Sequence, residues 1–263
     1  FQFLHGLLSI KQVSIFYLER EMKKKIRLGV NIDHFATLRN VRDEKEIKLI
    51  DIAKVIKNEK ADSITVHLRE DRRHIKDSDV TQLINENLLP INLEMAATYE
   101  MQKICLDSIP FACCIVPEKR EELTTEGGLD VINQKEHLSK IIEPLKKKKI
   151  RITLFIEPDL KQIEASKQVG ADAIEIHTGS YANNFKSNKF QSNLKKIKEG
   201  ANYAQKIGLE CHAGHGLNIE NVSYISEIEQ IIELNIGYSI VCDSLIFGLN
   251  QSIKKFIKKI NHC

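Results

Sequence analysis

The sequence lacks tryptophan and has no unbroken apolar stretch of about 18 residues, the shortest length typical of a membrane-spanning helix. It also lacks a strong excess of charge of either sign. The 39 Lys and Arg residues stand against 36 Asp and Glu, giving a formal net charge of +3. This small excess is too mild to indicate a nucleic-acid-binding protein. We therefore predict that the protein binds neither membrane nor nucleic acid.

The six cysteines are scattered, and no two of them form a C-x-x-C pair that would indicate a zinc site or a redox motif. Several lie within apolar runs, where a free thiol packs as a small hydrophobic side chain. This usage is typical of a reduced protein, and we predict a cytoplasmic location. The first residues include a short apolar stretch but neither a basic start nor a small-residue cleavage site, so no signal peptide is predicted.

Eight apolar runs bounded by turn residues recur along the chain, and each is followed by room for a helix. Such alternation predicts parallel βαβ units, and eight units in roughly 240 residues predict a closed (β/α)8 TIM barrel with extra helices. A doubly wound open sheet is the alternative. The runs are residues 26–33, 63–68, 89–95, 111–117, 150–157, 173–179, 209–215 and 233–241.

The chain is predicted to hold one catalytic domain. We expect residues 26–263 to form the single barrel, and residues 1–25 to be an N-terminal extension outside it. Met22 precedes three lysines, and we interpret it as the native start.

Polar and apolar side chains alternate along four of the runs. Because successive strand residues face opposite sides, the apolar set is expected to pack against outer helices and the polar set to point into the barrel. In this fold the active site lies at the carboxyl ends of the strands. The polar groups at or near these ends are Asn31, Asp33, His34, His67, Arg69, Glu94, Glu157, Glu175, His177 and His215.

These groups are suited to proton transfer, since histidine titrates near neutral pH and a buried carboxyl can have its pKa raised toward it. A single strand histidine is more often a hydrogen-bonded core residue, and Glu157 could instead cap the helix after Pro158. No run ends in an inward lysine, which argues against a Schiff base. No H-E-x-x-H or G-x-S-x-G motif occurs, although scattered histidines and carboxylates could still assemble a metal site.

Glycine-rich turns indicate sites for phosphate. "HAGHGLN" (212–218) follows the seventh run, and "NIGYS" (235–239) falls within the eighth as we define it. Loops after strands seven and eight commonly bind phosphate in this barrel. A second anion could bind Arg42, Arg69, Arg72, Arg73 and His74, although these charges could equally form ion pairs in solvent. The long segment 117–130 could close over the site, or be an ordinary surface loop.

Seven blocks of sequence occur in the order expected of the pyridoxine 5′-phosphate synthase family, which the chain resembles from about Leu28 to Leu249. The resemblance implies a cytosolic (β/α)8 barrel that works without metal or organic cofactor as a homo-oligomer, an octamer. It implies condensation of 1-deoxy-D-xylulose 5-phosphate with 3-amino-2-oxopropyl phosphate to pyridoxine 5′-phosphate, phosphate and water. The blocks are "GVNIDHFATLRN", "ITVHLREDRRHI", "NLEMA", "VPEKREELTTEGGLDV", "EIHTGSYA", "AGHGLN" and "ELNIG".

The resemblance also implies roles for individual residues. Glu94 and His67 match general bases, His215 matches a general acid, and Glu175 matches a group that stabilises developing positive charge. The positions matching those for deoxyxylulose phosphate are Asp33, His34, Arg69, His74 and Thr124. Those matching the positions for the amino ketone phosphate are Asn31, Arg42, Gly216, Gly237 and Tyr238.

Two residues depart from the family pattern. Tyr238 stands where the family usually has His, and His212 where it usually has Asn. We expect the first to alter side-chain contact with phosphate, and the second to affect the pKa of His215. A metal-dependent aldolase or hydrolase barrel acting on a phosphorylated small molecule is the alternative function, and a catalytically silent phosphate-binding barrel is a third.

Overall fold

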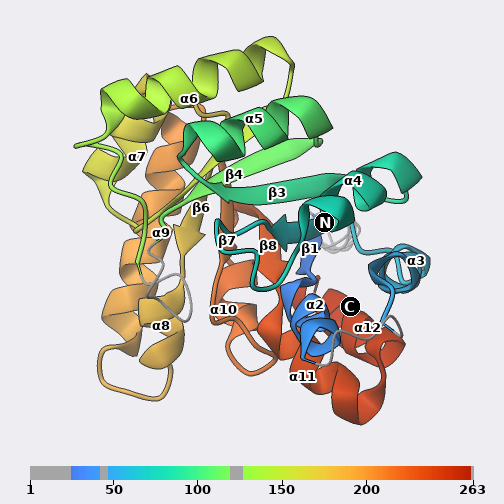
Figure 1. Cartoon of the computed structure of the whole chain (residues 1–263). Helices are drawn as coiled ribbons and strands as arrows, with labels where there is room; N and C mark the ends of the chain where they lie inside the picture. Colours follow the sequence, from blue (N-terminus) through green and yellow to red (C-terminus); the bar gives the residue numbers. More distant parts are fainter. Residues whose placement is uncertain (1–24, 42–46, 119–126, 262–263) are drawn as a thin grey trace, which may run out of the picture.

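The computed structural model describes residues 25–41, 47–118 and 127–261. Eight parallel strands close into a barrel in chain order, with β1 paired to both β2 and β8 (Figure 1). The predicted closed barrel is confirmed, and the open-sheet alternative is wrong. Residues 1–24 lie outside the described residues, so the predicted extension stays a prediction.

Helices alternate with the strands and surround them, as Figure 1 shows. The strands are β1 (Arg27–Asn31), β2 (Ser63–His67), β3 (Ile91–Ala96), β4 (Ala112–Val116), β5 (Arg151–Ile156), β6 (Ala173–His177), β7 (Glu210–Gly214) and β8 (Ile231–Ile236). The helices are α2 (Asp33–Asn40), α3 (Leu49–Asn58), α4 (Asp77–Glu86), α5 (Tyr99–Ser108), α6 (Lys135–Lys147), α7 (Leu160–Gln168), α8 (Gly179–Asn183), α9 (Phe190–Lys206), α10 (Val222–Ser226), α11 (Tyr238–Phe247) and α12 (Leu249–Ile260).

The outward faces of the strands form the main hydrophobic core with the surrounding helices. Ile64 and Val66 on β2 and Leu93 on β3 belong to this core and are almost fully buried. The intervening residues belong to the other face, where Cys114, Val116 and Phe155 form a separate apolar cluster. The barrel interior is therefore apolar beside β4 and β5.

The amino-terminal end of the barrel interior carries paired charges. Arg27 on β1 donates to Glu233 on β8 and to Glu210 on β7, at 2.7 Å in each case. Arg151 on β5 forms an ion pair with the same Glu210. This layer neutralises itself, which leaves the opposite end of the barrel for ligands.

The eighth apolar run is divided between a strand and a helix. β8 ends at Ile236, Gly237 makes the turn, and α11 begins at Tyr238. The prediction of a strand continuing to residue 241 is therefore wrong. Ile240 and Val241 are buried residues of the helix. Because they are apolar and β-branched, they continue the strand-like pattern in the sequence. The turn places the amino terminus of α11 beside the carboxyl end of β8.

The basic segment at the end of the chain forms an amphipathic helix, as its pattern predicts. α12 buries Ile253, Phe256 and Ile260 and has Lys258 and Lys259 in its last turn. It packs on α11, α10 and α3. Among the described residues, no helix is both long and apolar enough to cross a membrane.

Candidate active site

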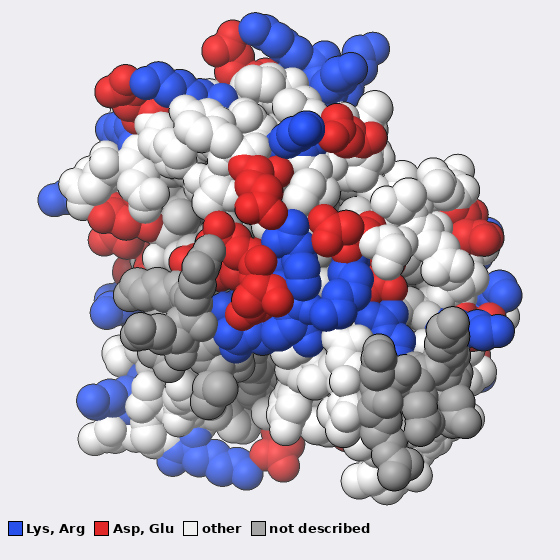
Figure 2. Space-filling model, in the orientation of Figure 1, with Lys and Arg blue, Asp and Glu red and all other residues white. Residues whose placement is uncertain are grey.

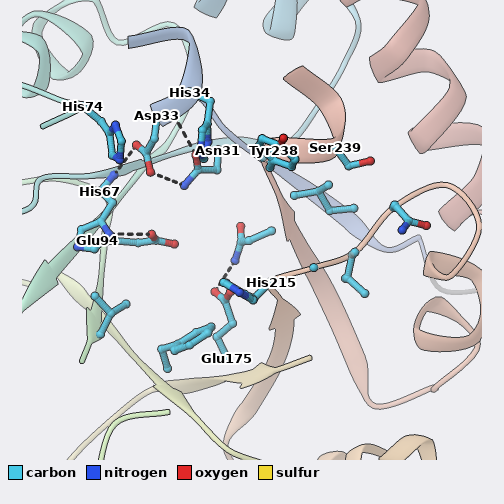
Figure 3. A pocket seen from close by; sticks show the side chains of 18 of the residues that line it. Asn31, Asp33, His34, His67, His74, Glu94, Glu175, His215, Tyr238 and Ser239 are labelled. Carbon is cyan, nitrogen blue, oxygen red and sulfur yellow. Dashed lines mark hydrogen bonds and ion pairs between the residues drawn. The ribbon is translucent and has the colours of Figure 1, made fainter. Parts of the chain in front are cut away.

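A cavity of about 560 Å³ opens at the carboxyl ends of the strands (Figure 3). Its walls bring together twelve of the residues that the sequence singled out. Arg42 and Thr124 lie outside the described residues, and their roles stay predictions. The predicted residues that line the cavity are Asn31, Asp33, His34, His67, Arg69, His74, Glu94, Glu175, His215, Gly216, Gly237 and Tyr238.

Asp33 links the start of α2 to the end of β2. One carboxylate oxygen accepts the backbone N–H of His67 at 2.8 Å, and the other accepts the Asn31 amide at 2.8 Å. The Asn31 side chain in turn accepts the backbone N–H of Asp33 at 3.0 Å. Burial raises the pKa of Asp33, although His67 and these donors oppose the rise. The network fixes the position of His67 at the cavity wall.

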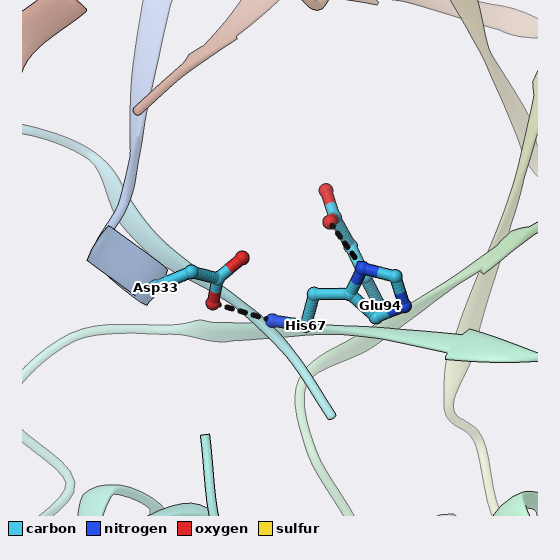
Figure 4. A group of neighbouring side chains, drawn as sticks. All are labelled: Asp33, His67 and Glu94. Carbon is cyan, nitrogen blue, oxygen red and sulfur yellow. Dashed lines mark hydrogen bonds and ion pairs between the residues drawn. The ribbon is translucent and has the colours of Figure 1, made fainter. Parts of the chain in front are cut away.

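His67 and Glu94 are neighbours on β2 and β3, with His67 Nδ1 3.9 Å from Glu94 Oε2 (Figure 4). Burial, together with the neighbouring carboxyls of Glu175 and Asp33, raises the pKa of Glu94 well above its usual value. A carboxyl whose pKa lies closer to neutrality is a stronger base once ionised. The pair can therefore move protons to and from a molecule in the cavity.

The same side chains could hold a metal ion. Each of Asp33, His67 and Glu94 offers one ligand atom, and these three atoms lie within 4.8 Å of one another (Figure 4). A His and two carboxylates are a donor set that first-row divalent metals accept. This geometry keeps the metal-dependent alternative open to a direct test.

Glu175 is buried on β6 and held by a residue that the sequence argument did not single out. The Asn235 amide on β8 donates to Glu175 Oε2 at 2.7 Å and its oxygen accepts from Thr65 at 3.1 Å. Burial raises the pKa of Glu175 to about 7, against the lowering effects of His212 and Asn235. Asn235 follows the same inward parity as Glu233, so the alternation used for four strands also finds it on the eighth.

His215 follows β7 with a positive φ of 77°, which is unusual for a residue with a side chain. The Thr178 hydroxyl lies 2.6 Å from the His215 carbonyl and 2.7 Å from that of Gly214, and it stabilises this bend. Burial lowers the pKa of His215 to about 4, with a further lowering from His177 and an opposing effect from Glu157.

His177 and Glu157 form a pair beside the cavity and are not among its lining residues. His177 Nδ1 lies 2.6 Å from Glu157 Oε1, and its ring centroid lies 4.8 Å from that of His215. Asp159 caps α7, accepting from the backbone N–H groups of Lys161 and Gln162. The alternative role of Glu157 as that cap is therefore wrong.

Two backbone segments at the cavity are shaped for an anion. Gly216 has a φ of 76°, a conformation that glycine adopts without strain. Gly237 precedes α11, whose first N–H groups have no partners within the helix. A helix amino terminus with free N–H groups favours phosphate. Both segments lie at the loops after strands seven and eight, where the sequence predicts phosphate sites. The second segment is formed by Gly237 and the first turn of α11.

The charged run after β2 divides into two parts. Arg69 and His74 line the cavity, and Arg69 is buried. Arg72 instead donates to Asp77 at 3.0 Å and to Glu100 at 2.7 Å, and Arg73 donates to Asp71 at 2.7 Å. Figure 2 shows basic and acidic side chains next to one another across the middle of the face in view. The anion-binding interpretation thus fits His74 and Arg69, and the ion-pair interpretation fits Arg72 and Arg73. Arg69 also takes part in ion pairs, with its Nε 3.8 Å from Asp71 Oδ1 and 3.7 Å from Glu118 Oε1.

His212 acts on different neighbours from the one expected. Its ring lies inside the barrel on β7, with Nδ1 3.5 Å from Glu233 Oε1 and Nε2 3.4 Å from an Arg27 nitrogen. In its charged form His212 lowers the pKa of Glu175, its register partner on β6, although burial lowers the pKa of His212 itself. The groups that shift the pKa of His215 are His177 and Glu157. The expectation that His212 shifts the pKa of His215 is therefore wrong.

Residues 28–262 match the model of the family described as pyridoxal phosphate biosynthesis protein PdxJ. The chain is 52% identical over 233 residues to pyridoxine 5′-phosphate synthase of Sulfurihydrogenibium sp. (strain YO3AOP1), covering 88% of this chain and 96% of the relative. It is 49% identical to the synthase of Aquifex pyrophilus, with 88% and 100% covered, and 48% identical to that of Rhodospirillum rubrum, with 89% and 94% covered.

Solved structures share the fold at much lower identity. 3-Hexulose-6-phosphate synthase from Salmonella typhimurium superposes with a TM-score of 0.62 at 10% identity, covering 90% of this chain and 99% of that one. 3-Keto-L-gulonate-6-phosphate decarboxylase from Vibrio cholerae gives 0.61 at 10% identity, covering 91% and 99%. At this identity the likeness shows the barrel architecture alone.

Proposed function

The chain belongs to the pyridoxal phosphate biosynthesis protein PdxJ family, and we propose that it acts as a pyridoxine 5′-phosphate synthase through the cavity at the carboxyl ends of its strands. The reaction condenses 1-deoxy-D-xylulose 5-phosphate with 3-amino-2-oxopropyl phosphate. The observation that carries the assignment of the site is one cavity that combines acid–base groups with two anion-binding regions. Its substrates are phosphorylated small molecules.

The two phosphates are assigned to two adjoining walls of the cavity, which meet where His34 packs against Tyr238. The amino ketone phosphate binds at Gly216 and at Gly237–Tyr238, where backbone N–H groups can approach an anion. The sugar phosphate binds toward Arg69 and His74, with Asp33 and His34 beside them. Arg42 and Thr124 complete these two groups in the proposal. The reacting carbons then lie between the walls, within reach of the acid–base groups.

The proton transfers are assigned to the residues between these walls. Glu94 and His67 take protons as general bases, and Glu175 stabilises positive charge that develops on the imine nitrogen. His215 donates a proton to a leaving oxygen. Among the described residues that line the cavity there is no lysine, and the amino ketone supplies the only amine that the condensation requires.

The assignment of His215 as an acid predicts proton uptake on binding. Its pKa of about 4 means that the ring is neutral at pH 7. A phosphate close to the ring favours the charged form and raises the pKa. The protein should therefore take up a proton when phosphate binds at pH values between about 4 and the raised pKa. Calorimetric titration of inorganic phosphate, a product, in buffers of different ionisation enthalpy measures this uptake.

The control for proton uptake uses a histidine outside the cavity. His137 Nε2 lies 2.6 Å from the Ala97 carbonyl, so His137→Gln should leave the uptake unchanged. His215→Gln should reduce it, with the remainder coming from His74, whose pKa burial also lowers to about 4. The proton that phosphate itself exchanges is common to all three proteins and cancels in the comparison. Equal uptake by wild type and His215→Gln would contradict the acid role.

The function is tested by incubating the purified protein with both phosphates and following pyridoxine 5′-phosphate by absorbance and mass. We expect the product and one equivalent of inorganic phosphate. Activity that survives a chelator in metal-free buffer would dismiss the metal-dependent alternative, including an ion at Asp33, His67 and Glu94. Turnover that is lost with chelator and restored by a divalent metal would favour it. Absence of product under both conditions would leave a phosphate-binding barrel.

We further propose that the protein works in the cytoplasm as a homo-oligomer, the octamer that the sequence resemblance implies. Several large apolar side chains are exposed near α2 and α11, which supports association through that part of the surface. Light scattering of the protein as it elutes from a size-exclusion column measures the mass of the oligomer. These side chains are Leu38, Val41, Leu245, Ile246 and Phe247.

A further inference from the structure

Glu118 is a buried carboxylate two residues beyond the end of β4, and none of the roles above uses it. Its side chain has 0% exposure. One carboxylate oxygen, Oε1, accepts the backbone N–H of Glu70 at 2.8 Å. The other, Oε2, lies 3.3 Å from His67 Nε2. Burying a carboxylate is costly unless it is paired, so these two contacts account for the presence of a charged group at this buried position.

His67 therefore lies between two carboxyl groups. Nδ1 faces Glu94 at 3.9 Å, and Nε2 faces Glu118 at 3.3 Å. Among the described residues, neither His67 Nε2 nor Glu118 Oε2 has a hydrogen-bond partner, and the two atoms face each other at ion-pair distance. The contact is within hydrogen-bond distance but poorly aligned, a geometry that catalytic groups can tighten during reaction. Each of these two buried atoms thus has the other as its available partner.

The two carboxyl groups differ in their charge. Burial raises the pKa of Glu118, but His67, the Glu70 N–H and Arg69 together outweigh burial and hold this pKa below its usual value. Glu118 is thus ionised near neutral pH and can only accept a hydrogen bond. The pKa of Glu94 is raised instead. A neutral imidazole has one N–H, and the ionised acceptor beside Nε2 favours placing the proton there.

We propose that Glu118 is a positioning residue that keeps the proton of His67 on Nε2, so that Nδ1 presents its lone pair toward Glu94 and the cavity. Nδ1 is then the atom that accepts a proton from substrate. The inference depends on the proposed function for the role of His67 in turnover, but the tautomer itself can be measured without substrate. The logic is that of the buried Asp in serine-protease triads, which orients its histidine without itself taking up a proton.

Glu118→Gln removes the negative charge of the side chain and keeps its shape. Because Glu70 N–H still requires an oxygen acceptor, the amide of the variant would direct its NH2 group toward His67 Nε2. That donor needs a lone pair on Nε2, so the proton should move to Nδ1. We expect the tautomer change in ¹⁵N NMR spectra of histidine-labelled protein. We also expect kcat to fall at least tenfold with little change in either KM, and Glu118→Asp to recover part of the loss.

The matched control is Glu100→Gln, which removes an exposed carboxylate that pairs with Arg72 on the neighbouring charged run. It should leave both the tautomer and kcat unchanged. The inference is overturned if wild-type His67 carries its proton on Nδ1, a result that needs no variant to fold. It is also overturned if folded Glu118→Gln keeps the wild-type tautomer and a kcat within threefold of wild type. If wild type makes no product, the proposed function fails, while the NMR spectrum still decides the tautomer.

Discussion

Replacement of Glu94 by glutamine is expected to slow turnover by about a hundredfold to ten-thousandfold, the usual loss when a general base is removed. The side chain lies on β3 at the cavity wall, 15% exposed, with its Oε2 3.9 Å from His67 Nδ1. Glutamine has nearly the same shape but cannot accept a proton at neutral pH. The loss should therefore fall on kcat more than on either KM.

The same substitution should leave the fold intact, and the pKa of Glu94 gives the reason. Burial raises this pKa above that of an unfolded chain. The carboxyl's contribution to stability is therefore fully present below its ordinary pKa, and is lost as pH rises toward the raised value. Glutamine resembles the protonated form at every pH. Glu94→Gln should thus melt at the wild-type temperature in acid and at the same or a higher temperature near pH 7.

Steady-state kinetics and thermal melts at two pH values test this prediction together. Glu86→Gln is the control, because Glu86 is exposed at the end of α4 and away from the cavity. Turnover of folded Glu94→Gln within threefold of wild type would remove Glu94 from the mechanism. A large loss of melting temperature near pH 7 would show instead that the charged form stabilises the fold.

The fold and much of the cavity wall follow from patterns that a single sequence carries. Alternation places Ile64 and Val66 outside and Thr65 and His67 inside because a strand has a period of two. β8 could not be delimited in this way, since the buried apolar residues of α11 continue the run. Its inward Asn235 follows the same alternation of strand side chains as Glu233. The paired charges at the amino-terminal end of the barrel interior also follow the inward alternation. Which of them pair depends on how the barrel closes, because the partners come from β1, β5, β7 and β8.

Glu118 could not be predicted from local patterns. β4 is buried on both faces, so its sequence does not alternate in polarity. The glutamate then stands in "EKREE", which reads as one charge of a solvated loop. Its burial depends on the approach of Glu70 and His67, which lie 48 and 51 positions earlier in the chain and come close only when β2, β3 and β4 pair. Sequence spacing carries no signal for such a contact.

Gly237→Val is expected to weaken binding of the amino ketone phosphate by about tenfold to over a hundredfold, which corresponds to losing one charge-assisted hydrogen bond of roughly 1.5–3 kcal/mol. The turn before α11 has no room for a side chain. A Cβ at residue 237 would come within 2.8 Å of Asn31 Cβ and 2.9 Å of Asn31 Oδ1. Either the turn or Asn31 must move, and both belong to the proposed phosphate wall.

Tyr238→His is the matched comparison, because it changes the next side chain without crowding the backbone. Tyr238 is 68% exposed and packs edge-on against His34, with ring centroids 5.2 Å apart. If backbone N–H groups of the first turn of α11 hold the phosphate, the identity of this side chain should matter little. We therefore expect the KM for the amino ketone to change by less than about threefold, since the backbone contacts are preserved.

The ranking of the two variants decides which part of residues 237 and 238 binds the phosphate. Both proteins are first compared with wild type by circular dichroism and thermal melting, so that a folding defect in Gly237→Val is recognised. The KM for the amino ketone is then measured with the other substrate saturating. A larger effect from Gly237→Val places the contact on the backbone at the amino terminus of α11. A larger effect from Tyr238→His, with both variants folded, would place it on the side chain and contradict the backbone cradle.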